Sequence, residues 1–132
     1  MPPLNSAITG YVAGNTLNVA RIVSRIPTGR TLAKAWLTLK AKITDADPGA
    51  LQKTITSTLT SSGQILDIGN GLGSYPVGTG SIVFILSIAD TLTLGTLITY
   101  QYDIKFKMDN TDVSTLEFGP FILVPSVSTI TV

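Results

Sequence analysis

Carboxylates are the main residues in this chain that could do chemistry, because the sequence has neither histidine nor cysteine. These two absences exclude a Ser-His-Asp triad, a cysteine nucleophile, a cysteine-rich zinc site and a disulfide framework. A glycoside hydrolase would need two carboxylates facing each other across a cleft. Only eight acidic residues are available, one of them Glu117, and most of the others lie in predicted turns. We therefore predict that the protein is not an enzyme, with no catalytic residue and no cofactor.

The part of the sequence that most resembles a metal-binding loop contains Asp45, Asp47 and Gly49. Calcium prefers clustered carboxylate oxygens on a tight turn, so a calcium loop is one interpretation. An EF-hand loop would need glycine in place of Ala50 and glutamate in place of Thr56. We therefore favour a solvated turn and predict that no metal is bound.

A glycine-rich run at residues 69–74, Gly-Asn-Gly-Leu-Gly-Ser, could cradle a phosphate, because bare backbone amides bind anions. Nucleotide-binding loops of this kind lie between a strand and a helix. The sequence predicts no helix after this run, and the Lys-Ser/Thr pair of a P-loop is missing. The run is interpreted as part of a flexible connection that extends to Gly80.

Aromatic side chains could stack against a sugar ring. Tyr100 and Tyr102 share a predicted strand face with other apolar residues, so we assign both to the core. Trp36, Tyr11 and Tyr75 remain as aromatic residues that could be exposed.

Trp36 shares its predicted strand face with Lys34 and Thr38, so we expect it on the outer face of a sheet. A large aromatic side chain there often marks a contact surface. The alternatives are a subunit contact and ordinary coverage by a loop or by the N-terminal segment.

Short strands must position all of these residues. Period-two alternation is strongest at residues 33–43 and 97–107, and residues 81–88 read as a central strand buried on both faces. In the first of these, the side chains predicted to face inward are Ala33, Ala35, Leu37, Leu39, Ala41 and Ile43. Further strands are predicted at residues 16–26, 54–60, 65–68, 113–118, 121–124 and 127–132, with turns at 27–30, 45–49, 89–92 and 109–112 and a break at Gly119-Pro120. No amphipathic helix is predicted.

This pattern predicts an all-β fold, an antiparallel immunoglobulin-like β-sandwich formed by residues 16–132. The strands at residues 33–43 and 100–106 are expected to form opposite walls of one core. Asp109 and Asp112 are interpreted as residues of a hairpin turn.

Residues 1–15 mix proline, glycine and scattered apolar residues, and we predict an extended N-terminal arm. We expect this arm to be mobile in a monomer and to become buried on assembly against a neighbour's sheet edge. Its apolar anchors, together with the exposed tryptophan, are the predicted protein-contact residues: Leu4, Ile8, Tyr11, Val12 and Trp36.

The chain's length and composition limit the classes of partner. It has 132 residues, enough for one domain, and a formal net charge of +1, so it offers no general attraction for nucleic acid or an anionic membrane. Charged residues make up only 13% of the sequence, against about 25% in typical soluble domains. A surface this poor in charge associates easily, so we expect a homo-oligomer inside a larger assembly. No signal peptide and no apolar run of membrane-spanning length are visible, which predicts synthesis in the cytoplasm.

Five segments, taken in chain order, carry a family resemblance: residues 21–29 (RIVSRIPTG), 35–41 (AWLTLKA), 45–49 (DADPG), 100–105 (YQYDIK) and 117–125 (EFGPFILVP). Together they resemble immunoglobulin-like structural modules of tailed bacteriophages. The last two are similar to the final strands of the amino-terminal module of phage baseplate upper proteins. The resemblance spans residues 16–127 and implies a virion component without catalytic residues. We expect no receptor-facing continuation after Val132, so a decoration or adaptor role fits as well.

The leading hypothesis is therefore a non-enzymatic virion structural protein, made in the host cytoplasm. It would be a capsid decoration or cement protein, or a tail-baseplate subunit, that contacts other virion proteins. The alternative is a carbohydrate- or receptor-binding β-sandwich, which a cluster of exposed aromatic residues on one face would favour.

Overall fold

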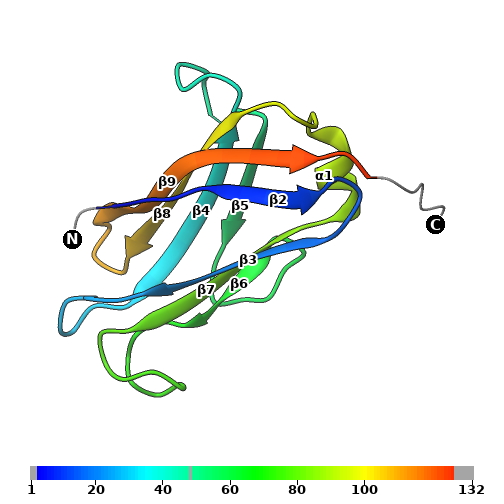
Figure 1. Ribbon diagram of the computed structural model, residues 1–132. Coiled ribbons are helices and arrows are strands. Elements are labelled where there is room, and N and C mark those ends of the chain that lie inside the picture. Colours follow the sequence, from blue (N-terminus) through cyan, green and yellow to red (C-terminus); the bar gives the residue numbers. More distant parts are fainter. Residues whose placement is uncertain (1–2, 48, 127–132) are drawn as a thin grey trace.

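Two β-sheets pack face to face in the computed structural model, which describes residues 3–47 and 49–126 (Figure 1). The strands in chain order are β1 (Leu4–Asn5), β2 (Ile8–Val12), β3 (Leu17–Val23), β4 (Leu32–Lys40), β5 (Leu51–Ile55), β6 (Gly63–Asp67), β7 (Gly80–Leu86), β8 (Tyr100–Met108) and β9 (Val113–Val124). A short helix, α1 (Ile88–Thr93), connects β7 to the segment before β8. The last predicted strand, residues 127–132, lies outside the described residues.

The six-stranded sheet has the order β1-β9-β8-β4-β5, with β2 also paired to β9, and the three-stranded sheet has the order β3-β7-β6. All pairs between neighbouring strands are antiparallel except those of β1 and β2 with β9, which are parallel. The predicted all-β antiparallel sandwich is therefore confirmed.

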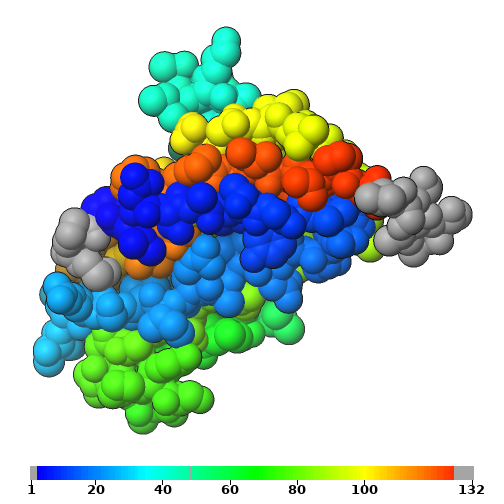
Figure 2. Space-filling model, viewed as in Figure 1, coloured from blue at the N-terminus to red at the C-terminus, as the bar shows by residue number. Residues whose placement is uncertain are grey.

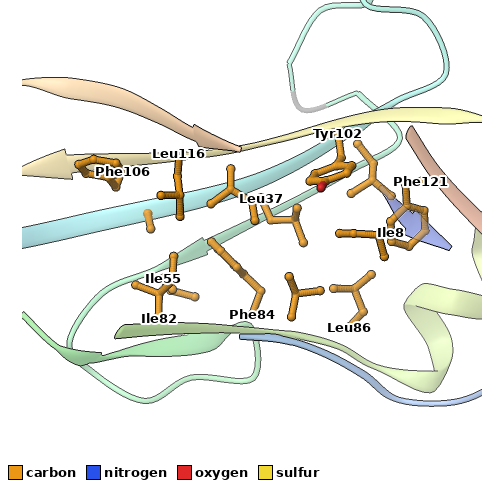
Figure 3. Close-up of a cluster of buried hydrophobic side chains, with 14 of the residues drawn as sticks. Ile8, Leu37, Ile55, Ile82, Phe84, Leu86, Tyr102, Phe106, Leu116 and Phe121 are labelled. Carbon is orange, nitrogen blue, oxygen red and sulfur yellow. The ribbon is translucent and has the colours of Figure 1, made fainter. Parts of the chain in front are cut away.

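The core lies between the two sheets, where inward-facing side chains of both sheets meet (Figure 3). Leu37 on β4 and Ile104 on β8 are fully buried, and so is Phe84 on β7 across from them. Leu37 and Ile104 are register partners on neighbouring strands. The expectation that these two strands form opposite walls is wrong, because both belong to one wall and β3, β7 and β6 form the other.

Strand β4 is shorter than the predicted strand at residues 33–43. Its register shifts between Leu32 and Lys34, so Leu32 faces the core and Ala33 is exposed. A bulge of this kind inserts one residue and moves the alternation to the other face. Ala41 and Ile43, which were expected to face inward, are exposed in the loop after β4.

Strand β9 continues through the predicted break at Gly119-Pro120. The N-terminal segment lies alongside β9 at this point, and the Ser6 N–H donates to the Phe118 carbonyl at 2.9 Å. A Cβ atom on Gly119 would lie 1.6 Å from the Ser6 carbonyl oxygen. Glycine therefore marks a close backbone approach rather than the end of a strand.

Helix α1 occupies the segment that was predicted as a turn. Ser87 caps it: its hydroxyl accepts from the Asp90 N–H at 3.2 Å, and the Asp90 carboxylate accepts from the Ser87 N–H at 2.8 Å. Lys53 on β5 forms an ion pair with Asp90 at 2.7 Å. This reciprocal capping satisfies backbone donors that a short helix leaves free.

Candidate functional site

The N-terminal segment, which was predicted to be an arm, is part of the six-stranded sheet. In Figures 1 and 2 it runs alongside β9. Parallel pairing places Ile8 opposite Phe121, and Ile8 is only 4% exposed, within the core of its own chain (Figure 3). The expectation that Ile8 becomes buried only on assembly with a neighbour is therefore wrong. Leu4 and Tyr11 are exposed and Val12 is half-buried, so these three can still contact another molecule.

Arg21, Tyr102 and Glu117 form a buried polar cluster that links the two sheets. The Arg21 guanidinium on β3 donates to both Glu117 carboxylate oxygens on β9, from Nε at 2.6 Å and from Nη2 at 2.9 Å. The Tyr102 hydroxyl on β8 donates to the same carboxylate. Glu117 is 2% exposed, whereas the Arg21 side chain is 30% exposed at the edge of β3. This bidentate geometry is the strongest form of a carboxylate pair.

The electrostatics of this cluster keep Glu117 charged. Burial alone would raise the pKa of Glu117, but the hydrogen bonds from Arg21 and Tyr102 and the Arg21 charge outweigh it and hold the pKa below its ordinary value. Burial, together with the hydrogen bond to the Glu117 carboxylate, raises the pKa of Tyr102 to about 12. Glu117 therefore remains ionised inside the link between the two sheets, with both carboxylate oxygens engaged by Arg21 and Tyr102.

The outer face of the three-stranded sheet carries no charged side chain and exposes large apolar ones, and we call it the apolar face. Its members point away from the core and carry no charge: Asn18, Ala20, Ile22, Gln64, Leu66, Ser81, Val83 and Ile85. Ile22 is 49% exposed and Leu66 is 61% exposed. Val83 and Ile85 are half-buried, so the prediction that the 81–88 strand is buried on both faces is wrong. No second layer covers this side of the sheet in the described residues.

The glycine-rich loop before β7 forms one wall of a hollow of about 560 Å³ beside the apolar face. Asp67, at the end of β6, holds this loop through two hydrogen bonds: its carboxylate accepts from the Gly69 N–H at 2.9 Å and from the Tyr75 N–H at 3.2 Å. A Cβ atom on Gly73 would lie 2.6 Å from the Asp67 carboxylate, so glycine lets the loop close over it. The loop leads into strand β7, so the setting of a nucleotide-binding loop is missing.

Trp36 lies on the outer face of the six-stranded sheet, as predicted, and is partly exposed. It lines a polar hollow of about 480 Å³ together with Gln52, Asp103 and Lys105. Tyr11 and Tyr75 line two other hollows, so the three eligible aromatic residues do not gather into one platform. Tyr100 and Tyr102 are buried, as predicted.

The acidic turns hold local backbone and side-chain groups. Asp45 accepts from the Lys42 N–H at 3.1 Å, and Asp47 pairs with Lys40 at 2.8 Å. Asp112 lies in the hairpin turn between β8 and β9, as predicted, and accepts from the Asn110 amide at 2.9 Å. Within residues 3–47 and 49–126, no three acidic side chains are grouped so that they could hold a metal ion. Among the same residues, no helix is long and apolar enough to cross a membrane.

Sequence reasoning missed the buried cluster and the apolar face. Arg21 and Glu117 are 96 positions apart, and no local pattern pairs them. The apolar face did leave a signal, because Ala20 and Ile22 occupy positions of β3 where an exposed sheet would carry polar residues.

No protein-family model matches the sequence. No curated protein matches it either.

Proposed function

We propose that this chain is a non-enzymatic, immunoglobulin-like structural protein of a tailed-phage virion, a capsid decoration or tail-baseplate subunit that acts through protein–protein contacts. The phage assignment rests on the sequence resemblance described above. The observation that carries the contact role is the apolar face with its neighbouring hollow. The strand order, a tyrosine at the start of β8 and the charge distribution around the apolar face support the proposal.

The strand order supports the immunoglobulin-like part of the proposal. In an immunoglobulin sandwich the second and fifth strands pair in one sheet, while the third, sixth and seventh form the other. If β2 is the first strand, then β3-β7-β6 corresponds to the sheet of the second, fifth and fourth strands. Strands β4, β8 and β9 then correspond to the third, sixth and seventh, and β5 is an additional edge strand.

Tyr100 supports the same assignment. Immunoglobulin sandwiches often have a tyrosine near the start of the sixth strand whose hydroxyl bonds to the backbone a few residues upstream. Tyr100 begins β8, and its hydroxyl accepts from the Gly95 N–H at 2.8 Å. Tyr102 stands two residues later, where antibody domains have the second cysteine, and here it belongs to the polar cluster that links the two sheets.

The charge distribution supports a second copy of this chain as the occupant of the apolar face. Two charged residues, Arg21 and Asp67, also line the hollow, and both are already engaged, Arg21 with Glu117 and Asp67 with loop amides. A twofold axis would lay the face against itself without opposing like charges. The net charge of +1 adds almost no repulsion between copies. Exposed apolar surface of this kind marks a contact site in soluble proteins.

Sedimentation equilibrium tests the contact role. The wild-type protein is expected to form a reversible dimer, and Ile22→Lys to remain monomeric, because dimerisation would bury an unpaired ammonium group. Thr54→Lys places the same charge on an exposed position of the six-stranded sheet and should leave the dimer unchanged. Equal thermal melting of both variants would show that they fold. A wild-type protein that stays monomeric, or an Ile22→Lys variant that still dimerises, contradicts the proposal.

Mass spectrometry of purified phage particles tests the virion role. Particles produced by the strain that carries the gene should contain this chain at a stoichiometry repeated between preparations. Its absence from intact particles, with the protein present in the lysate, would contradict the assignment to a virion.

A further inference from the structure

We propose that the hollow around Trp36, on the outer face of the six-stranded sheet, binds a neutral saccharide. This inference goes beyond the protein-contact role, because it concerns the opposite side of the sandwich and a different class of ligand. The eligible aromatic residues form no shared platform, so Trp36 alone supplies the stacking surface. The inference rests on its partial exposure, on the polar groups in the adjoining row and on a balance of charge.

The strand registers place these groups side by side. Trp36 on β4 pairs with Thr54 on β5 and Lys105 on β8. Neighbouring strands lie about 4.8 Å apart, so side chains of one row on three strands can contact the same small ligand. The hollow of about 480 Å³ that these strands line is large enough for one or two sugar rings.

The next row of the sheet supplies the hydrogen-bonding groups. Thr38 pairs with Gln52 on one side and Asp103 on the other. The Gln52 amide donates one hydrogen to the Thr38 hydroxyl at 2.9 Å, which fixes the amide and leaves its carbonyl oxygen and second hydrogen for a ligand. In the described part of the chain, no hydrogen bond ends on the Asp103 carboxylate. A carboxylate that can accept two hydroxyl donors suits a vicinal diol.

Asp103 is already partly withdrawn from water. Burial raises the pKa of its carboxyl, and the nearby Asp47 adds to the effect, while Lys105 and Lys40 oppose it. A ligand that covers Asp103 therefore removes less hydration than it would from a fully exposed carboxylate.

The charges around the hollow favour a neutral ligand. Among the residues that line the hollow, Lys40 and Lys105 balance Asp47 and Asp103, and the Lys40–Asp47 ion pair measures 2.8 Å. An anionic ligand would meet two carboxylates, and a cationic one would meet two ammonium groups. A saccharide instead offers hydroxyl groups to the polar row and an apolar ring face to Trp36.

Tryptophan fluorescence gives a specific readout, because Trp36 is the only tryptophan in the chain. The probes are neutral trisaccharides of glucose, galactose, mannose or N-acetylglucosamine, titrated to millimolar concentration. At least one is expected to change the emission in a saturable way. A sulfated disaccharide and a lysine-rich peptide serve as charged probes and are expected to leave the emission unchanged.

Amide chemical shifts measured by NMR then test the residues. Trp36→Ala should weaken saccharide binding roughly tenfold, as expected for the loss of an aromatic stacking partner. Trp36→Phe should retain part of the affinity, and Asp103→Asn should weaken binding through the loss of a charge-assisted acceptor. Leu59→Ser, at an exposed apolar position outside the hollow, is the matched control and should bind like the wild type.

The amide spectrum of each variant also shows whether it is folded, so a loss of binding can be separated from a loss of structure. No response to any neutral probe, binding of charged probes alone, or full affinity in a folded Trp36→Ala variant would each overturn the proposal.

Discussion

The outer faces of the two sheets differ sharply, although both sheets share one core. The three-stranded sheet presents exposed Ile22 and Leu66 and no charged side chain, whereas the six-stranded sheet presents Trp36 among lysines and aspartates. Burial of apolar surface is favourable and non-directional, so the first face suits contact with protein. The polar groups of the second face favour a hydroxylated ligand. The two proposed contacts, with protein on one side and with a saccharide on the other, therefore depend on different chemistry.

The largest expected effect tests the claim that both sheets contribute fully buried side chains to one core. Phe84→Ala on the three-stranded sheet should lower the free energy of unfolding by about 3–5 kcal/mol, and Leu37→Ala on the six-stranded sheet by about 2–5 kcal/mol. Both side chains are fully buried, so each substitution leaves a cavity. Urea denaturation measures both values. A nearly neutral result for either variant would mean that the two sheets do not share a single core.

A second prediction concerns the N-terminal strands β1 and β2, which pair with β9 in the six-stranded sheet. Ile8→Ala should lower the free energy of unfolding by about 2–4 kcal/mol, because Ile8 packs in the core. Leu4→Ala, at an exposed position of the same segment, should change it by less than about 0.5 kcal/mol. Equal effects in thermal or urea unfolding would restore the interpretation of this segment as an arm.

A third prediction concerns the link between the sheets. Glu117→Gln should lower the free energy of unfolding by about 3 kcal/mol, the low end for a broken buried pair, because Arg21 can still reach water. Arg21→Lys should also destabilise the protein, since an ammonium group cannot bind both carboxylate oxygens in the same way. Urea denaturation at neutral pH measures these values, and an unchanged midpoint for Glu117→Gln would contradict the structural role of the cluster.

The smallest expected effect is the acid dependence of this link. The pKa of Glu117 is lower in the folded protein than its ordinary value of 4.5. Its contribution is therefore fully present above about pH 4.5 and is lost as the pH falls through the folded pKa. Glu117→Gln should lose less stability than the wild type over this range. Asp90, whose pKa is also lowered, contributes to both proteins and cancels in the difference.

The sequence predicted the fold class because β-sandwiches leave period-two patterns, as at Tyr100–Met108. It predicted the wrong limits for β4, since a bulge changes the face of Ala33 without changing the composition. Helix α1 was missed although Ser87 and Asp90 have the spacing of a capping box. This spacing indicates the start of a helix, but the strand pattern of the surrounding sequence outweighed it in the prediction.

The candidate surfaces were harder to predict from the sequence than the fold class, because they depend on tertiary contacts. Trp36 was placed on the correct face because its strand alternates regularly. Ile8 was misassigned because parallel pairing with Phe121 joins positions 113 residues apart in sequence (121 − 8), which no local period reports. Residues of three strands line the Trp36 hollow, and only the strand registers bring Gln52 and Asp103 into the same row.

Methyl NMR spectra recorded across a dilution series test the contrast between the two faces most directly. The account predicts concentration-dependent shifts at Ile22, Leu66 and Val83 and none at the indole of Trp36 in the absence of saccharide. Shifts centred on Trp36, or spectra that do not change with concentration at any of these positions, would contradict the assignment of the apolar face as the protein-contact surface.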